Sequence, residues 1–525
     1  MKEEMMMMLI IFFTGILVFV MKVLWLKPKK IEEHFGKQGI KGPPYCFFIG
    51  NVKEIISLAM KASSQPIPMP FSHNILPRVL SFYHHWNQTY GPMFLVWFGR
   101  TARLTLADPD HIREVFCLKP EFYEKFEAHP LIKQLEGDGL LNLKGEKWAY
   151  HRKIITPTFY MNNIKLFVPV LTGSVVKMLD KWLTMSDFGK VEIEVSQWYQ
   201  NLTEDTMTRT AFGNNHLDGK RIFQLQARQM ILTSEAFKAI PIPGYKFLPT
   251  KRNLESWKLH KEINKSLIRV IEKRRTLGDM DMVNGPKDLL GLMVEASRKE
   301  SSPVITAHDI AEECKSFFFA GEQTTANLLT WTTVLLAMHP EWQVIARDEV
   351  LNVFGSCDIP TKDCVSKLKM LNMILNESLR LYPPIVASLR RAKANVELGG
   401  YKIPRGTEFL IPVVAIHHDQ SIWGTDANEF NPRRFSNGVA RASKHSMAFF
   451  PFGLGVRRCI GQNLAILQAK LTIAMILQRF SFELSPKYQH APTVLMMLHP
   501  QHGAPIIFKH LRTSPSTKEN EGSFP

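Results

Sequence analysis

The feature that most constrains this chain is a single cysteine in a turn rich in glycine and aromatic residues, at residues 448–465. A segment with helical apolar spacing follows, so Cys459 lies near a predicted helix start, where N–H groups and the helix dipole stabilise a thiolate. Gly455 permits a close backbone approach, and Gly461 permits a flat group to lie against the helix. With Arg457 beside the sulfur, the turn predicts a haem site, in which thiolate binds iron and arginine binds a propionate. A buried structural cysteine is the alternative.

The turn also resembles the haem-thiolate signature of the cytochrome P-450 family, Phe-x-x-Gly-x-Arg-x-Cys-x-Gly. Its positions are filled by Phe452, Gly455, Arg457, Cys459 and Gly461. The resemblance implies one large domain of the cytochrome P-450 fold, mainly α with small β-sheets (α+β). It also implies haem b as the cofactor, with Cys459 as the axial ligand of the iron and Phe452, Arg457 and Gly461 against the haem.

The composition fits one large catalytic domain, because the chain has 525 residues, of which 45% are hydrophobic. Residues 160–300 show mostly helical spacing, with a loop at 241–244.

The formal net charge of +17 indicates an anionic partner. Lys and Arg are scattered and no basic–aromatic RNA module is present, so an anionic membrane or an acidic protein is expected rather than nucleic acid. The six cysteines form no Cys-x-x-Cys pair, which indicates a reducing compartment and argues against zinc or iron–sulfur sites.

Residues 5–26 are almost entirely apolar. About 22 such residues span the roughly 30 Å core of a bilayer, and an uncleaved signal anchor is predicted, with a cleaved secretory peptide as the alternative. Lysines follow the segment, so the positive-inside rule places the remainder in the cytosol. We expect a single-pass anchor with its basic stop at 1–30, a proline-ended linker at 31–45, the catalytic domain at 46–510 and a disordered tail at 511–525. The family resemblance makes the membrane that of the endoplasmic reticulum.

Trp148 and Arg152 are four residues apart, so they share one face of a predicted helix. An indole N–H and a guanidinium on one face can both donate to a carboxylate, although a packed tryptophan beside a surface arginine is the alternative. The pair resembles the family motif Trp-x-x-x-Arg, which implies that both residues hold a haem propionate. Arg390 resembles the second propionate arginine of the family, with the adjacent Arg391 as the alternative.

A long central helix is predicted over residues 307–338, with Thr306 and Asp309 as its capping box. Glycine and two adjacent threonines at 320–325 are poor helix formers, which predicts a local opening where a hydroxyl can hold water or a ligand. A tolerated kink is the alternative. The segment resembles the oxygen-activation motif of the family, which implies that Thr324 helps to deliver protons during oxygen activation.

The acid of that family motif falls on Gln323, and the nearest carboxylate is Glu322, which lies about 100° away around the helix. Glutamine can hydrogen-bond but cannot relay a proton by titration. Three explanations are open for proton delivery without that acid. Thr324 with a water delivers the proton, Glu322 reaches in through a distorted turn of the helix, or catalytic turnover is altered. We favour the first. Whichever of residues 317–320 face the haem would shape an apolar substrate pocket, to which we assign Phe317, Phe318 and Ala320.

Glu377 and Arg380 are three residues apart on a predicted apolar helix, so they can pair in a buried position. They match the Glu-x-x-Arg motif of the family. Arg434, in a later segment that resembles the family's meander, is implied to join them in a structural network that braces the haem turn. Arg433 stands where the family has glutamate, which removes one expected charge partner.

Together the patterns predict a membrane-bound haem-thiolate monooxygenase that hydroxylates a small apolar substrate with O2. The resemblance implies electrons from NADPH through an acidic flavoprotein reductase, docking near Arg458, Lys147 and Lys153. Residues 501–504 resemble a plant microsomal clan that acts on terpenoids and hormones, so a terpenoid, steroid or hormone-like substrate is expected. One alternative is a haem-thiolate isomerase or dehydratase that needs no reductase, which Gln323 mildly favours. Another is a membrane-anchored haem-binding protein without enzyme activity.

Overall fold

The computed structural model describes residues 2–128, 130–213, 216–237, 248–276, 288–299, 305–355 and 360–511. The predicted loop at 241–244 and the predicted tail, apart from Leu511, lie outside the described residues. The described chain is mainly α-helical with small β-sheets, as the sequence predicts. The helices of the body are α3 (Val52–Ser63), α4 (Leu76–Val79), α5 (Ser81–Tyr90), α6 (Pro109–Arg113), α7 (Pro130–Glu136), α8 (Gly145–Ile155), α9 (Met161–Ile164), α10 (Val168–Met185), α11 (Val195–Phe212), α12 (His216–Phe237), α13 (Lys251–Thr276), α15 (Leu289–Lys299), α16 (Ala307–Met338), α17 (Pro340–Phe354), α18 (Lys362–Lys367), α19 (Lys369–Leu381), α20 (Val413–His417), α21 (Gln420–Trp423) and α22 (Gln462–Arg479).

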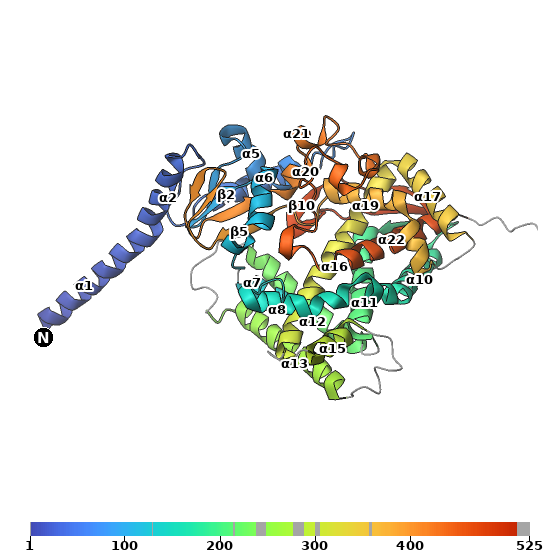
Figure 1. Cartoon of the computed structure of the whole chain (residues 1–525), viewed down its shortest axis with the longest axis horizontal. Helices are drawn as coiled ribbons and strands as arrows, with labels where there is room; N and C mark the ends of the chain where they lie inside the picture. Colours follow the sequence, from blue (N-terminus) through green and yellow to red (C-terminus); the bar gives the residue numbers. More distant parts are fainter. Residues whose placement is uncertain are drawn as a thin grey trace, which may run out of the picture.

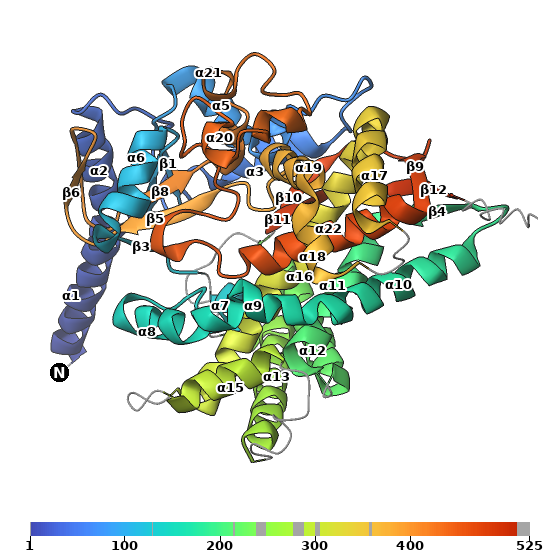
Figure 2. The same ribbon diagram turned by 45° about the vertical axis from the view of Figure 1, so that its right-hand side comes forward.

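The main sheet has five strands in the order β1-β2-β8-β5-β3. Its strands are β1 (Leu95–Phe98), β2 (Thr101–Thr105), β8 (Glu408–Ile411), β5 (Ser388–Ala392) and β3 (Tyr123–Lys125). In the described residues, a three-stranded sheet and two hairpins make up the other β-structure: β4 (Lys190–Glu194) with β12 (Pro505–His510) and β9 (Phe480–Leu484), β10 (Pro492–Leu495) with β11 (Met497–Pro500), and β6 (Val396–Leu398) with β7 (Tyr401–Ile403). Figure 2 shows the main sheet beside the N-terminal helices, with α12, α13 and α15 at the opposite end of the body.

The N-terminal helix projects away from the body (Figure 1). It comprises α1 (Lys2–Met21), a π-helical turn (Lys22–Leu26) and α2 (Lys27–Gly36). The stretch Glu3–Gly36 is long and apolar enough to cross a membrane, and its most apolar part is not buried against the rest of the protein. Its far end packs on the body, because the hydroxyl of Tyr45 donates to the carbonyl oxygen of Leu24 at 2.6 Å. The helix and this contact join the predicted anchor firmly to the domain.

The helix α16 runs through the middle of the body, packed against α11, α13 and α22 (Figure 1). Its bounds match the predicted helix, and Thr306 and Asp309 form the predicted capping box, with both side chains bonded to the other residue's backbone N–H. Nearly all side chains from residues 310–319 and 325–336 are buried, whereas residues 320–324 between them are half-exposed. This middle turn of α16 therefore borders an open space.

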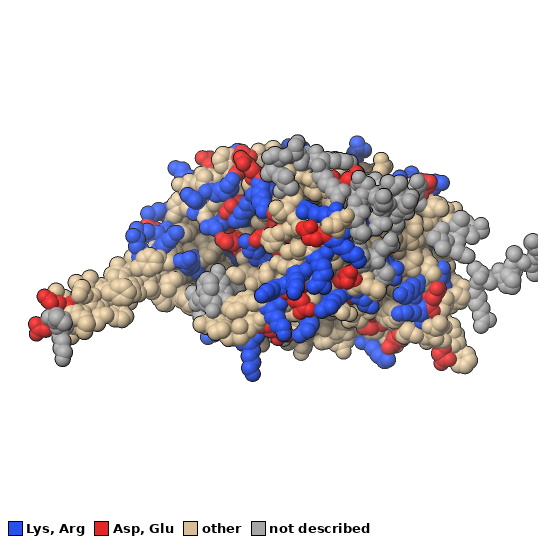
Figure 3. Space-filling model, turned by 90° about the horizontal axis from the view of Figure 1, so that it is seen from below, with Lys and Arg blue, Asp and Glu red and all other residues tan. Residues whose placement is uncertain are grey.

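Lys and Arg side chains gather across the middle of the face seen from below in Figure 3. The helix α13, which is lowest in Figure 1, is rich in basic residues there. Its glutamates at positions 255 and 262 pair with arginines of α12, at 3.0 and 3.2 Å, so the outward charge of this face is positive. Part of the positive charge of the chain thus gathers on this face.

Candidate active site

Cys459 lies in a tight turn just before α22. Its backbone N–H donates to the carbonyl oxygen of Phe452 at 2.8 Å, which closes the turn. Gly455 has a φ of +64°, and a Cβ there would lie 2.0 Å from the carbonyl oxygen of Phe116, so this position requires glycine. A Cβ on Gly461 would meet nothing within 4 Å. That side of the turn is open, as a flat ligand requires.

Cys459 is exposed as a residue, while protein atoms around its sulfur partly desolvate it. This desolvation raises the pKa of the Cys459 thiol, while the N–H groups of Gly461 and Gln462 and the charge of Arg152 act to lower it. A bound metal cation deprotonates a coordinating thiol. The N–H donors and the nearby cation therefore suit a metal-bound thiolate.

Trp148 and Arg152 lie on α8 beside the cysteine turn. A guanidinium nitrogen of Arg152 donates to the carbonyl oxygen of Arg458 at 2.8 Å. The guanidinium of Arg457 lies over the indole of Trp148, 4.3 Å from the ring centre, in a cation–π contact. The structure thus brings Trp148, Arg152 and Arg457 together around the turn.

Two more cations, Arg390 of β5 and Lys125 of β3, lie opposite each other in the sheet. The guanidinium of Arg390 stacks over the ring of Phe116 at 4.3 Å. Burial and the charge of Arg457 lower the pKa of Arg390 to about 10, and burial and the charge of Arg152 lower the pKa of Arg457 to about 10. We call these four residues, Lys125, Arg152, Arg390 and Arg457, the cationic cluster. Its members repel one another, so the cluster favours a bound anion.

The middle of α16 remains one continuous helix, so the predicted opening is not a break in the backbone. The hydroxyl of Thr324 donates to the carbonyl oxygen of Ala320 at 2.6 Å. The amide of Gln323 donates to the sulfur of Met230 on α12 at 2.8 Å. Ala320, Glu322, Gln323 and Thr324 are all partly exposed, so each of them borders the open space beside α16.

Glu322 lies where α16 approaches the helix α11. A Cβ on the preceding residue, Gly321, would lie 2.7 Å from the methyl carbon of Met207, which shows how closely α11 and α16 approach. Burial raises the pKa of Glu322 to about 7, with a further increase from the charge of Glu204 on α11. Glu322 is thus close enough to Glu204 to feel its charge, and it lies about 200° around the helix from Thr324.

Phe317 and Phe318 pack into the core instead of bordering the open space. The ring of Phe318 lies 4.3 Å from that of Phe223, and the ring of Phe317 lies 5.3 Å from that of Phe159. Phe319 instead belongs to a separate small cluster from α7, the loop between α7 and α8, α12, α16 and the β10–β11 hairpin. Its members are Leu135, Leu141, Met230, Phe319, Met496 and Met497. The assignment of Phe317, Phe318 and Ala320 to a substrate pocket stays a prediction; of the three, Ala320 is the residue that is partly exposed.

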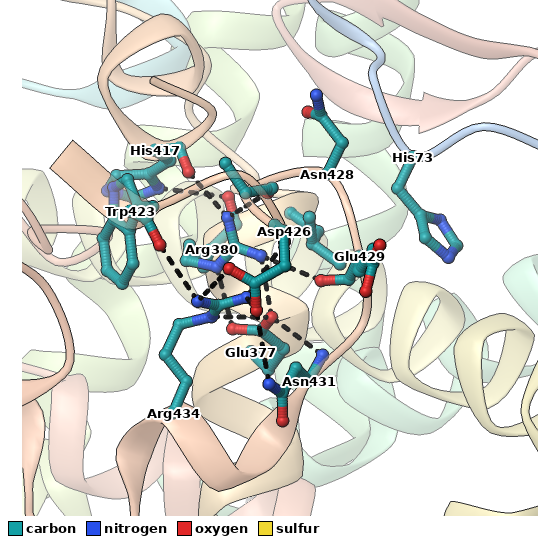
Figure 4. Close-up of polar contacts among 12 residues, drawn as sticks. His73, Glu377, Arg380, His417, Trp423, Asp426, Asn428, Glu429, Asn431 and Arg434 are labelled. Carbon is teal, nitrogen blue, oxygen red and sulfur yellow. Dashed lines mark hydrogen bonds and ion pairs between the residues drawn. The ribbon is translucent and has the colours of Figure 1, made fainter. Parts of the chain in front are cut away.

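Glu377 and Arg380 pair on α19, and both side chains are fully buried. The carboxylate of Glu377 accepts two hydrogen bonds from the guanidinium of Arg380, at 2.7 and 2.8 Å. Arg380 also donates to the carbonyl oxygens of His417 and Ala427, at 2.8 and 2.6 Å (Figure 4). Arg434 reaches the same carboxylate of Glu377 at 3.4 Å. The structure thus brings together the three residues of the predicted network.

The missing glutamate of this network has a substitute, Asp426. The carboxylate of Asp426 accepts from both terminal nitrogens of Arg434, at 2.7 and 3.2 Å (Figure 4). The hydrogen bond from Arg434 is the main cause that lowers the pKa of Asp426. Arg433 points elsewhere, over the ring of Trp342 at 5.8 Å. Sequence reasoning missed Asp426, because its partner lies eight residues further along an irregular segment.

The family model for cytochrome P-450 matches residues 64–506. The chain belongs to the cytochrome P-450 family. It is 67% identical over 497 residues to cytochrome P-450 734A1 of Arabidopsis thaliana, which covers 94% of each chain. It is 56% identical over 514 residues to cytochrome P-450 734A6 of Oryza sativa subsp. japonica, 95% of each chain, and 41% identical over 499 residues to cytochrome P-450 72A397 of Kalopanax septemlobus, 94% of this chain and 95% of that protein. The recognition of a plant-type cytochrome P-450 monooxygenase from the sequence is confirmed.

The P-450 family implies a haem-thiolate centre, and the residues of this chain fit one. Among the described residues, Arg152, Arg390 and Arg457 form no ion pair with a carboxylate, so their charges remain available to an anion. Cys459 and the open side at Gly461 supply a thiolate and room for a flat ring. Two propionates at the edge of such a ring would neutralise charge of these three arginines, whereas Lys125 lies 3.7 Å from the carboxylate of Glu136. Lys125, whose short strand has no distinctive pattern, is the member of the cationic cluster that sequence reasoning missed.

Proposed function

We propose that this P-450 is a single-pass membrane enzyme that hydroxylates a small apolar substrate with O2, using electrons from NADPH through a flavoprotein reductase. Terpenoid, steroid and hormone-like molecules are the expected substrate classes. The observation that carries the proposal is the cysteine turn with the cationic cluster beside it. The apolar helix Glu3–Gly36 supports anchoring, and we place the anchor in the endoplasmic reticulum with the domain in the cytosol.

When bound, haem b ligated by Cys459 supplies oxygen activation, because thiolate donation favours O–O cleavage. In the proposed arrangement Trp148, Arg152, Arg390 and Arg457 hold the propionates, and Phe452 and Gly461 lie against the ring. These are the haem-contacting residues assigned from the sequence.

The chain's own residues prepare the substrate side. Phe319 and the methionines around it provide an apolar, adaptable wall that excludes water and orients an apolar substrate. The hydroxyl of Thr324 donates its own proton to the carbonyl oxygen of Ala320, so its oxygen accepts from a water and holds that water as the proton donor. We assign proton delivery to Thr324 with water rather than to Glu322, because Glu322 lies where α16 approaches α11. Gln323, which cannot titrate, orients a water or a polar group of the substrate.

We place reductase docking on a basic surface next to the cysteine turn. Lys147, Lys153 and Arg458 are exposed there, on α8 and in the turn itself. An acidic flavoprotein would be attracted to this surface by charge complementarity, and the rate of its association would fall as salt increases. This surface lies next to Cys459, which gives a short path for electrons.

A reduced, carbon monoxide-bound difference spectrum tests the haem assignment first. The wild type should give the long-wavelength Soret band of a thiolate-ligated haem, and Cys459→Ala should lose it. Persistence of that band in Cys459→Ala would exclude Cys459 as the ligand. Full-length enzyme in vesicles with reductase and NADPH should then convert members of a terpenoid and steroid panel to products heavier by one oxygen atom. Product formation without reductase would instead support an isomerase or dehydratase.

A further inference from the structure

Residues 137–143 form an irregular loop between α7 and α8 that lies directly against α16. A Cβ on Gly137 would lie 2.5 Å from the carbonyl oxygen of Glu312, and a Cβ on Gly139 would lie 2.6 Å from the carboxylate of Glu313. The two glycines therefore permit an approach to α16 that a side chain would prevent. We call residues 137–143 the bridge loop.

Two carboxylates of α16 hold the near side of the bridge loop. Glu312 accepts from the backbone N–H of Asp138 at 2.7 Å, and Glu313 accepts from that of Leu140 at 2.9 Å. The second oxygen of Glu313 lies 2.7 Å from Nδ1 of His151 on α8, and both side chains are buried, 1% and 3% exposed. Hydrogen bonds to a carboxylate are roughly twice as strong as neutral ones. The near side of the loop is therefore firmly attached to α16.

The far side of the bridge loop presents two carbonyl oxygens to the cationic cluster. The carbonyl of Leu141 accepts from the ammonium of Lys125 at 2.6 Å. The carbonyl of Leu143 accepts from the guanidinium of Arg457 at 2.9 Å. Arg457 is the residue that stacks on Trp148. One short loop thus joins the buried carboxylates of α16 to two cations beside the cysteine turn.

We propose that Glu313 is a positioning residue: it fixes the bridge loop, whose carbonyl oxygens aim Lys125 and Arg457 at the haem propionates. The inference rests on the proposed function, because the propionates are the anions to which the two cations are directed. The path from the anchored N–H of Leu140 to the carbonyl of Leu143 covers only four residues, a span of at most about 14 Å. Displacement of the anchored end therefore moves the acceptor of Arg457.

Two variants perturb the anchor in different ways. Glu313→Gln keeps the shape of the side chain and removes its charge. Gly139→Ala keeps every charge and pushes the loop away from α16 through the added Cβ. Both should raise deuterium exchange of the amides in residues 137–143 of the haem-free protein by about ten-fold or more. In the holoenzyme both should accelerate haem transfer to apomyoglobin and shift the haem reduction potential to more negative values, because less positive charge faces the propionates.

A matched control is Glu194→Gln. Glu194 also accepts a loop N–H, that of Ala504 at 2.7 Å, with Gly503 packed against it, but it lies at the β4–α11 corner outside the cationic cluster. This variant should increase exchange near residue 504 and leave the reduction potential unchanged. The proposal would be overturned if Glu313→Gln and Gly139→Ala had the same haem reduction potential and the same rate of haem transfer as Glu194→Gln. A wild type without the thiolate–haem spectrum would overturn the proposed function instead. Deuterium exchange in the haem-free protein would still test the attachment of the bridge loop to Glu313.

Discussion

The Nε2 atom of His417 accepts a hydrogen bond from the backbone N–H of Phe450 at 3.3 Å. Because an N–H group can only donate, Nε2 is unprotonated, and Nδ1 donates to the carbonyl oxygen of Arg380 at 3.2 Å. Burial and the charge of Arg380 lower the pKa of His417 to about 3, which keeps the ring neutral. His417 therefore links the Glu377–Arg380 pair to the segment that leads into the cysteine turn.

Replacement of His417 by phenylalanine should destabilise this segment. The ring keeps its approximate size, but the buried N–H of Phe450 loses its acceptor, at a cost of about 1–3 kcal/mol in the free energy of unfolding. We expect a lower urea midpoint and faster haem loss, measured by denaturation followed in the Soret region. His417→Gln restores an acceptor and should recover part of the loss. Equal stability of His417→Phe and wild type would contradict the link.

The Arg434 network makes a prediction about Asp426. Asp426→Asn removes the charge that holds both terminal nitrogens of Arg434, so we expect a loss of about 1–2 kcal/mol and lower haem occupancy in the purified protein. The matched variant is Arg433→Glu, which restores the family residue. Because Arg433 faces Trp342, this change should alter stability by no more than about 0.5 kcal/mol. A larger change in stability for Arg433→Glu than for Asp426→Asn would show that position 433, not Asp426, holds the partner of Arg434.

Asp426 and Arg434 also show which contacts the sequence alone does not predict. The bounds of α16 follow from local signals, because Thr306 and Asp309 cap the helix through their own neighbours. The Glu377–Arg380 pair follows from helical spacing in the same way. The partner of Arg434 does not, because an irregular segment has no period that fixes which side chain returns to it.

The same limit applies to the open space beside α16. Adjacent helix residues differ by about 100° in direction, so the choice among Phe317, Phe318 and Phe319 depends on how α16 is rotated against its neighbours. That rotation is set by packing with α11, α13 and α22, which are distant in sequence. The cationic cluster shows both cases, because Arg152 is recognisable from a motif and Lys125 is not.

Glu322 should make stability depend on pH. Its pKa is about 7 in the folded protein and about 4.3 in an unfolded chain, so unfolding releases a proton between these values. The free energy of unfolding therefore falls as pH rises from about 4.3 to 7, by up to about 1.4 kcal/mol per pH unit. Glu322→Gln lacks this contribution. In urea denaturation, the free energy of unfolding of Glu322→Gln minus that of the wild type should be larger at pH 8 than at pH 4.5. A difference that does not change with pH would contradict the burial of Glu322 near Glu204.

Thr324 should control the coupling of oxygen consumption to product formation. Thr324→Ala removes the hydroxyl at the middle of α16, so we expect NADPH and O2 to be consumed with several-fold less product per O2. Thr324→Ser keeps the hydroxyl and should remain coupled. Glu322→Gln is the second comparison, because Glu322 lies where α16 approaches α11 and its loss should not uncouple the enzyme. Uncoupling by Glu322→Gln alone would assign proton delivery to Glu322.

Phe318→Ala and Phe319→Ala should separate packing from substrate binding. The ring of Phe318 lies among Phe212 and Phe223, so its removal leaves a core cavity and should cost about 3–5 kcal/mol in the free energy of unfolding. Phe319 belongs to the methionine-rich wall proposed for the substrate, and its truncation should mainly raise KM and weaken the substrate-induced Soret shift. Denaturation curves and substrate titrations on both variants provide the test. A change in KM for Phe318→Ala without loss of stability would support the assignment of Phe318 to the pocket, as the sequence alone suggested.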